Sequence, residues 1–199
     1  MVRISADDLV SCCQDCGSGR DGGWPAAAWL YWVQEGIVTR GPYGDNTTCR
    51  PYEIPPCEHH TEGDLPPCTG DAETPACTKK CQEGYPTPYA KDKHYGLDTY
   101  AVRFGEEKIR KEIMTNGPVE ADFAVYADFL NYKSGVYKYI TGGHAIRLLG
   151  WGVENDTPYW LAANSWNTDW GDKGYFKILR GNNECGIEND IIGVTPKYG

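Results

Sequence analysis

Cysteine is the residue type that most constrains how this chain can fold. Nine of its 199 residues are cysteine, and eight of the nine lie between Cys12 and Cys81. The same stretch, continued to Pro88, holds most of the prolines, so long helices and strands cannot fill it. Disulfides persist in oxidising compartments, which indicates a secretory route rather than the cytosol. Four disulfides with one cysteine left over fit the count, but the residues alone leave the connectivity open.

A zinc site is the alternative use for these cysteines. Cys12 and Cys13, together with His59 and His60, supply the ligand types that zinc prefers. Tetrahedral zinc sites usually space their ligands by two to four residues, and neighbouring imidazoles point in different directions. We therefore favour disulfides, and the sequence implies no metal and no organic cofactor.

Length and charge exclude several classes of function. A chain of 199 residues supports one or two closely packed domains. The net charge of -9 argues against nucleic acid as a partner, because phosphate binding needs a cationic face. No stretch reaches the roughly 18 apolar residues that a membrane span needs, and no targeting segment is expected in this chain. Asn46 and Asn155 begin possible glycosylation motifs.

The two halves of the chain differ in character, with a change near residue 98. Pro25 in a first turn and Gly36 as a stop predict a helix at 25–35. Acidic residues in a first turn and a Gly-Pro terminator predict a second helix at 105–118. Evenly spaced segments in which apolar and polar residues alternate then favour an antiparallel sheet or barrel. The whole chain is therefore expected to have an α+β fold. These strands are expected at 119–126, 135–140, 144–151, 159–166 and 175–180.

His144 and Asn164 are predicted to lie close together in a hairpin. Their segments flank the polar turn at 154–157, and a turn centred near residues 154 and 155 places the two within two positions of each other. Opposed residues have Cβ atoms about 5 Å apart, so the amide oxygen of Asn164 can accept the imidazole N–H. The other ring nitrogen is then available to exchange a proton, as in a base for a nucleophile. The alternative is a strand histidine and a turn asparagine with no joint role.

Long motifs in this region resemble the papain family of cysteine peptidases. They are GGHAIRLLGWG at 142–152, PYWLAANSWNTDWGDKGYFKILRG at 158–181 and NECGIE at 183–188. The motif PPCEHH at 55–60 is similar to the cathepsin B group of that family. The resemblance implies a papain-like α+β fold, with the remainder of the helical (left) domain at 1–98 and a β-barrel-like (right) domain at 99–199. It also implies hydrolysis of peptide bonds, with His144 as base and Asn164 as its orienter.

The resemblance further implies how the cysteines pair. Arg20 stands where the family usually has one more disulfide cysteine. Cys185 is left outside the disulfides, and its acidic neighbour Glu184 disfavours a thiolate there. The implied pairs are Cys12–Cys77, Cys13–Cys16, Cys49–Cys81 and Cys57–Cys68.

Substrate-binding roles follow from the resemblance in the same way. Gly22 and Gly23 match a pair that bonds the substrate main chain, where a plain turn is the alternative. Asp190 matches an acid of the S2 pocket, where it accepts arginine, although an unaligned Asp190 is more often a solvated surface acid. The remaining expected contacts are Gly143, Ala145 and Trp166 around the imidazole, with His59 and His60 in an occluding-loop-like segment, 55–69, as donors to a C-terminal carboxylate.

The family's nucleophile is expected to lie outside this chain. No CGSCW-like motif occurs, so we expect the chain to lack the catalytic cysteine and to be inactive alone. A separate light chain then supplies the cysteine, or the chain is a shortened product that begins at Met1. Expected partners are peptide and protein substrates, a pro-segment and cystatin-like inhibitors, in a lysosomal or secreted setting. The rival interpretations are a non-catalytic homologue that binds proteins and a structural disulfide-rich module.

Departures from the family pattern concern the occluding-loop-like segment and the approach to His144. Leu65 replaces an arginine that ties this segment down, although its acidic partner is present as Asp169. TGGH at 141–144 is also shorter than in typical cathepsin B. We therefore expect a looser segment and more endopeptidase activity relative to removal of dipeptides.

Overall fold

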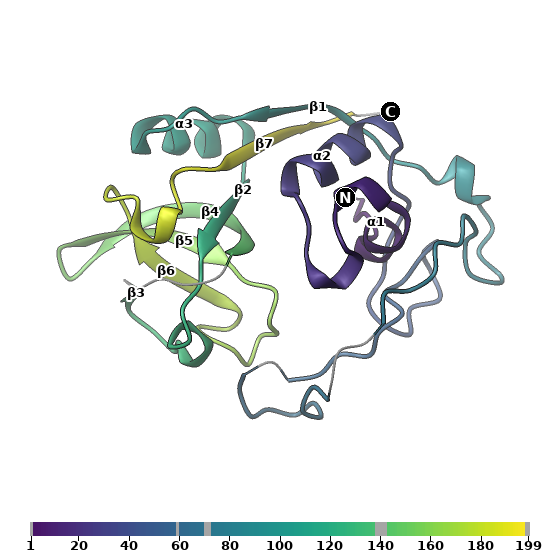
Figure 1. The fold of residues 1–199 in the computed structure, drawn as a ribbon, viewed down its shortest axis with the longest axis horizontal. Coiled ribbons are helices and arrows are strands. Elements are labelled where there is room, and N and C mark those ends of the chain that lie inside the picture. The colour runs from purple at the N-terminus through teal and green to yellow at the C-terminus, as the bar shows by residue number, and fades with distance from the viewer. Residues whose placement is uncertain (1, 59, 70–72, 138–142, 198–199) are drawn as a thin grey trace. The chain divides into compact units, whose positions relative to one another are not determined.

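The structure is a computed structural model that describes residues 2–58, 60–69, 73–137 and 143–197. Its contacts divide the chain into two compact units. The first unit comprises 1–56, 69–99 and 194–199, and the second comprises 57–68 and 100–193. The occluding-loop-like cysteines Cys57 and Cys68 thus belong to the second unit. Figure 1 shows the order of the helices and strands along the chain.

Two helices and three disulfides organise the first unit. Helix α1 (Ala6–Cys12) begins at Ser5, whose hydroxyl accepts a hydrogen bond of 3.1 Å from the Asp8 N–H. Helix α2 (Pro25–Gln34) confirms the helix expected at 25–35, with proline in its first turn. Cys12–Cys77, Cys13–Cys16 and Cys49–Cys81 join segments that are otherwise mostly loop.

A buried group of charges lies at the centre of the first unit. Arg50 is 3% exposed and contacts Asp7 at 2.5 Å and Asp8 at 3.5 Å, both of which are fully buried. Lys93 reaches Asp8 at 3.3 Å, and the Tyr89 hydroxyl donates to the same carboxylate at 2.7 Å. Both buried carboxylates therefore have a cationic partner, which buried charge requires, although Oδ1 of Asp7 has no hydrogen-bond partner among the described residues.

A seven-stranded sheet forms the framework of the second unit, and strands β1 and β7 continue into the first. The strand order is β1-β7-β2-β4-β5-β6-β3. Within the described residues the sheet is open, so the predicted barrel is not closed. The prediction of an antiparallel sheet is wrong for one pair, β3 and β6, which run parallel. The strands are β1 (Gly96–Ala101), β2 (Val119–Ala124), β3 (Val136–Tyr137), β4 (Gly143–Glu154), β5 (Thr157–Ala163), β6 (Tyr175–Leu179) and β7 (Ile191–Pro196).

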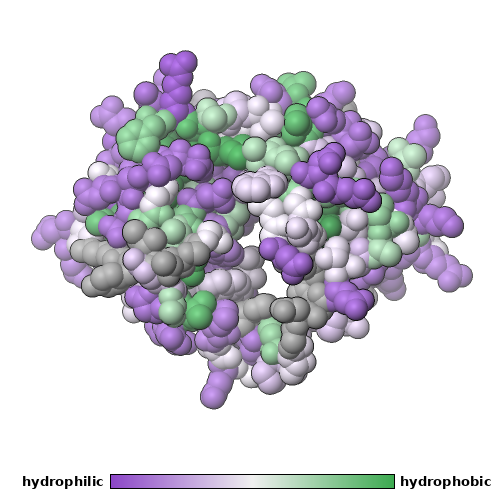
Figure 2. Space-filling view, in the orientation of Figure 1, coloured by the Kyte–Doolittle hydropathy of each residue, from purple (hydrophilic) through white to green (hydrophobic). Residues whose placement is uncertain are grey.

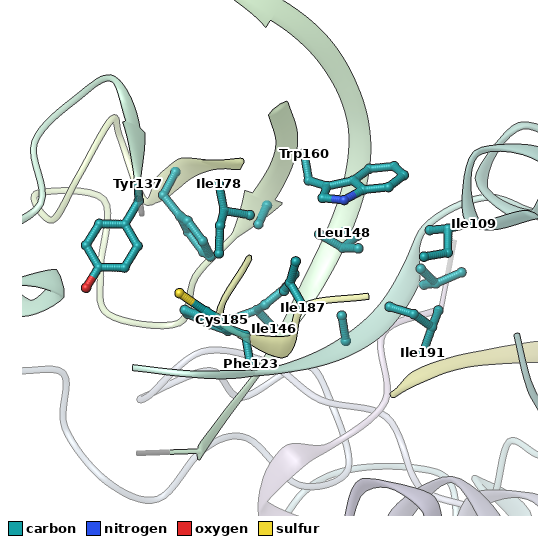
Figure 3. Packing of buried hydrophobic residues seen from close by; sticks show 14 of the residues in the cluster. Ile109, Phe123, Tyr137, Ile146, Leu148, Trp160, Ile178, Cys185, Ile187 and Ile191 are labelled. Atoms are coloured by element: carbon teal, nitrogen blue, oxygen red, sulfur yellow. The ribbon is translucent and has the colours of Figure 1, made fainter. Parts of the chain in front are cut away.

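Helix α3 (Glu106–Asn116) packs its apolar side against this sheet and confirms the helix expected at 105–118. Ile109 and Ile113 are its buried residues, and both belong to the core of the second unit. Figure 3 shows Ile109, Leu148 and Trp160 within this core. The core collects inward-facing residues of β2, β4, β5 and β6, which alternate with more exposed ones along each strand.

The β4–β5 hairpin turns one residue later than expected. Glu154 pairs with Thr157, so the turn residues are Asn155 and Asp156, with φ angles of 48° and 59°. Two consecutive positive φ angles suit the right-handed twist of a two-residue hairpin, and asparagine and aspartate tolerate them better than most residues. The register then shifts between Leu148 and Gly150, and pairing ends at Arg147 and Ala163.

The surface is predominantly hydrophilic on the face drawn in Figure 2, where apolar residues form small separate patches. This agrees with the high charge content of the chain. Across the described residues, no helix combines the length and apolar character that crossing a membrane requires.

Candidate active site around His144

A hydrogen bond joins His144 of β4 to Asn164, which directly follows β5. The Nε2 of His144 lies 2.8 Å from Oδ1 of Asn164. Both residues lie beyond the last paired residues of the hairpin, so their side chains make the contact rather than directly opposed strand positions. The Asn164 Oδ1 also accepts the Ser165 N–H at 2.8 Å, and the Asn164 N–H donates to the Gly174 carbonyl at 2.9 Å. These bonds hold the amide oxygen in place toward the ring.

Trp166 covers this pair with an aromatic surface. Its ring stacks on His144 with centroids 5.1 Å apart and an interplanar angle of 26°. Trp166 also meets Phe129 and Trp170 edge-on at 5.6 and 5.2 Å. Phe129 and Trp170 are fully buried, so the indole has a rigid support. The imidazole plane is therefore fixed by both stacking and hydrogen bonding.

The charge state of His144 depends on opposing influences. Burial lowers the pKa of the imidazole, because it disfavours the charged ring. The hydrogen bond to Asn164 and the negative charge of Asp122 act in the other direction and raise that pKa. Burial is the largest effect, so the net pKa lies below the ordinary value for histidine. An additional anion beside the ring would move it upward.

His60 is the one histidine of the expected occluding-loop pair that the structure describes. Its ring meets Trp166 edge-on, with centroids 5.0 Å apart. The indole thus contacts both His60 and His144, which brings two predicted site residues to one aromatic ring. His60 has a φ of 59°, an uncommon conformation for a side chain of this size. His59 lies outside the described residues.

Glu58 attaches the segment from Cys57 to Cys68 to the rest of the second unit. Its buried carboxylate accepts the Leu65 N–H at 2.9 Å and the Asn167 Nδ2–H at 2.9 Å. Asn167 also donates to the Cys57 carbonyl at 3.0 Å. Neither Glu58 nor Asn167 was identified from the sequence. Glu58 and Asn167 lie about a hundred residues apart in the chain, and no local sequence pattern indicates a contact over such a separation.

Asp169 lies beside Glu58. In the family pattern the partner of Asp169 is an arginine, and Leu65 replaces that arginine in this chain. Partial desolvation raises the pKa of Asp169, and the charge of Glu58, its hydrogen bond and Asp64 raise it further. Carboxyl oxygens of Glu58 and Asp169 both come within 3 Å of where a Cβ at Gly63 would lie. Two neighbouring carboxyl groups therefore lie beside Gly63 of this segment.

Gly143 and Ala145 flank the imidazole along β4. Both are exposed, and a Cβ added at Gly143 would meet no described atom within 4 Å apart from its chain neighbours. In the β2–β4 ladder Gly143 pairs with Ala124, and Ala145 pairs with Asp122. Asp190 is exposed and its carbonyl accepts the Asp122 N–H at 3.2 Å. Gly143, Ala145 and Asp190 therefore lie near the His144 segment, together with Asp122.

Gly22 and Gly23 lie in the first unit. Gly22 has a φ of 109°, and a Cβ there would meet nothing within 4 Å. A Cβ on Gly23 would lie 2.2 Å from the Cys16 carbonyl oxygen, so only glycine fits this close approach. The Trp24 N–H donates to that same carbonyl at 2.7 Å, which holds the glycine pair against the Cys13–Cys16 disulfide loop.

All eight cysteines expected in disulfides pair as the resemblance implied, the fourth bond joining Cys57 to Cys68. The ninth, Cys185, is 4% exposed. Figure 3 shows its sulfur among the core side chains, with Phe123 and Ile146 nearby. A thiol buried in apolar surroundings is a poor nucleophile. Within the described residues, no three His, Cys, Asp or Glu side chains gather as a metal site would need.

Comparisons with known proteins agree with this geometry. The model of the papain family cysteine proteases matches residues 1–195. A cathepsin B-like cysteine proteinase of Schistosoma japonicum is 57% identical over 196 residues, which cover 96% of this chain and 57% of the relative. Cathepsin B-like cysteine proteinase 6 of Caenorhabditis elegans is 52% identical over 203 residues, which cover 98% of this chain and 54% of the relative.

Solved structures show the same fold. Procathepsin B S9 from Trypanosoma congolense superposes with a TM-score of 0.84 at 42% identity, and the match covers all of this chain and 62% of that one. Procathepsin L 3 of Tenebrio molitor shares the fold at 21% identity, with a TM-score of 0.70. The chain spans just over half the length of the curated relatives that it matches. The match along nearly all of its residues shows that this chain belongs to the papain family of cysteine proteases, and the relatives named above are cathepsin B-like.

Proposed function

We propose that this chain is the histidine-bearing part of a cysteine peptidase that hydrolyses peptide bonds. The hydrogen bond of 2.8 Å between His144 and Asn164 carries the proposal. It fixes the ring and leaves Nδ1 to face a thiol, which is how a Cys-His pair is oriented. Because eight cysteines are in disulfides and Cys185 is buried, the nucleophilic sulfur comes from a part of the protein outside these 199 residues.

The chemistry follows from that arrangement. The thiolate attacks the carbonyl carbon of the scissile bond, and the His144 imidazolium then gives its proton to the leaving amine. A thioester remains on the sulfur. The neutral imidazole next takes a proton from water, and the resulting hydroxide attacks the thioester. This step releases the carboxylic acid, and the thiolate and the imidazolium are restored.

Substrate contacts are proposed at the residues that the family resemblance implied. Gly22 and Gly23 offer backbone groups to a peptide main chain, since no side chain shields them. Gly143 and Ala145 leave room beside the imidazole, Trp166 covers it, and Asp190 provides a carboxylate for a basic side chain. His59 and His60 would donate to the C-terminal carboxylate of a substrate and so support dipeptidyl-carboxypeptidase activity. A pro-segment and cystatin-like proteins are the expected inhibitors, in a lysosome or outside the cell.

Activity of the complete protein tests this proposal. A fluorogenic dipeptide substrate should be cleaved by the wild type, and His144→Ala should lower kcat/KM by about a thousandfold or more. His94→Ala is the matched control, since His94 belongs to the first unit and the His144–Asn164 pair to the second, and it should retain activity. Cleavage that survives in His144→Ala would overturn the role of His144 as the base. No cleavage by the wild type would favour a non-catalytic homologue that binds proteins.

A further inference from the structure

Asp122 of β2 lies opposite Asp190, which directly precedes β7. Glu120 and Ala121 of β2 pair with Ile192 and Ile191 of β7. One step further along the same ladder, the Asp122 N–H donates to the Asp190 carbonyl at 3.2 Å. Directly opposed residues in an antiparallel ladder have Cβ atoms about 5 Å apart, and like charges at such positions repel each other. Two acidic side chains thus share one position of the sheet.

The other neighbour of Asp122 in the sheet is Ala145, one residue after His144. Asp122 pairs with Ala145, and two positions along the same face Ala124 pairs with Gly143. Alternation puts Asp122, Ala145 and Gly143 on one face of the sheet, while Phe123 points into the core. Among the described residues other than its chain neighbours, no atom lies within 4 Å of a Cβ position at Gly143. Asp122 therefore lies two positions from the Ala124–Gly143 pair on this face, whereas Phe123 and its ladder partner His144 lie on the other face.

The charges around Asp122 do not neutralise the pair. Burial raises the pKa of Asp122 most, the charge of Asp190 raises it further, and a hydrogen bond from Glu120 and the charge of His144 lower it. Arg147 is the cationic residue of β4, and its ladder partner is Glu120 rather than Asp122. An incoming cation would relieve the repulsion between the two aspartates and offset their partial desolvation.

We propose that Asp122 is a second specificity-determining residue, which together with Asp190 selects substrates with a basic side chain at the position bound beside Ala145. This inference rests on the proposed peptidase function and extends its pocket from one carboxylate to two. An arginine guanidinium suits such a pocket best, because its planar array of N–H donors can bond both carboxylates at once. A phenylalanine side chain has no N–H group that could bond these carboxylates.

The test is a ratio of two substrates in the complete protein. kcat/KM is measured for two fluorogenic dipeptides that differ only in arginine or phenylalanine at the residue two before the cleaved bond. Asp122→Asn and Asp190→Asn should each lower the arginine-to-phenylalanine ratio by about fivefold or more. Asp122→Glu, which keeps the charge, should retain most of the ratio, and Glu107→Gln, which removes an exposed acid elsewhere in the second unit, should leave it unchanged.

The outcomes separate this inference from the proposed function. Hydrolysis of the phenylalanine substrate within about twofold of the wild type shows that the Asp122→Asn enzyme is folded and active. An unchanged ratio in such an enzyme overturns the role of Asp122 and leaves the peptidase function standing. Equal losses on both substrates also overturn it, because they indicate damage to the catalytic pair. A wild type that cleaves neither substrate overturns the proposed function and this inference with it.

Discussion

The Nε2 atom of His144 lies 2.8 Å from the Oδ1 atom of Asn164, and the ring of Trp166 stacks on the same imidazole. The hydrogen bond sets which ring nitrogen faces inward and which faces the proposed nucleophile. The stacking restricts rotation about the bonds of the histidine side chain. The contact with Asn164 leads to the first prediction.

Replacement of Asn164 should impair catalysis without removing the base. In Asn164→Ala the imidazole loses its orienting acceptor, so kcat/KM should fall by about 10- to 100-fold. Asn116→Ala, at the exposed end of α3, should change it little. Steady-state kinetics of the complete protein measure both variants. Full activity in Asn164→Ala would contradict an orienting role for this amide.

The pKa of His144 should respond to Asp122 and Asn164 in the same direction. Both raise the imidazole pKa against the larger effect of burial, so Asp122→Asn and Asn164→Ala should each lower it further. Titration of the ring protons by NMR measures this shift with the nucleophile absent or blocked. A rise of the pKa in either variant would show that burial and neighbouring charge have been assigned with the wrong sign.

Attachment of the segment from Cys57 to Cys68 should weaken as pH rises. The pKa of Asp169 is raised in the folded protein, so its contribution is present at low pH and is lost as pH rises through that folded pKa. Above it, Asp169 ionises beside Glu58. A glutamyl endopeptidase that cleaves at Glu62 should therefore cut the wild type faster than Asp169→Asn at pH 7, but equally fast at acid pH. Equal rates at both pH values would contradict this.

Arg50 should be essential for stability of the first unit. Arg50→Ala leaves Asp7 and Asp8 buried with a missing partner, which should lower the free energy of unfolding by about 3 to 5 kcal/mol. Urea unfolding followed by tryptophan fluorescence measures the change. Arg40→Ala, which removes an exposed arginine of the same unit, should cost less than about 1 kcal/mol. Similar losses in both variants would mean that the buried charges are not a coupled group.

Local patterns explain most elements that the sequence predicts. Pro25 and Gly36 mark helix α2, and the polar residues Asn155 and Asp156 mark the β4–β5 hairpin, since both signals act within a few residues. Helix α1 was not predicted, because seven residues in a cysteine-rich stretch carry little periodicity. Strands β1 and β7 were missed for a related reason, as partners distant in the chain define them.

In the candidate site too, contacts within one hairpin could be predicted from the sequence, whereas contacts between distant segments could not. The His144–Asn164 contact is foreseeable because one hairpin connects the two residues, although the turn lies one residue later than expected. The contact of His60 with Trp166 and the hydrogen bonds of Glu58 to Asn167 depend on the tertiary fold. The opposition of Asp122 and Asp190 depends on the register between β2 and β7, which the alternation of either strand does not determine.

The position of the reactive sulfur tests the central claim most directly. The complete protein is treated with a thiol-directed epoxide, and the modified cysteine is identified by mass spectrometry in the wild type and in His144→Ala. We expect one adduct, on a cysteine that is not among the nine of this chain, and a much slower reaction in His144→Ala. An adduct on Cys185, or labelling that proceeds equally well without the imidazole, would contradict the account.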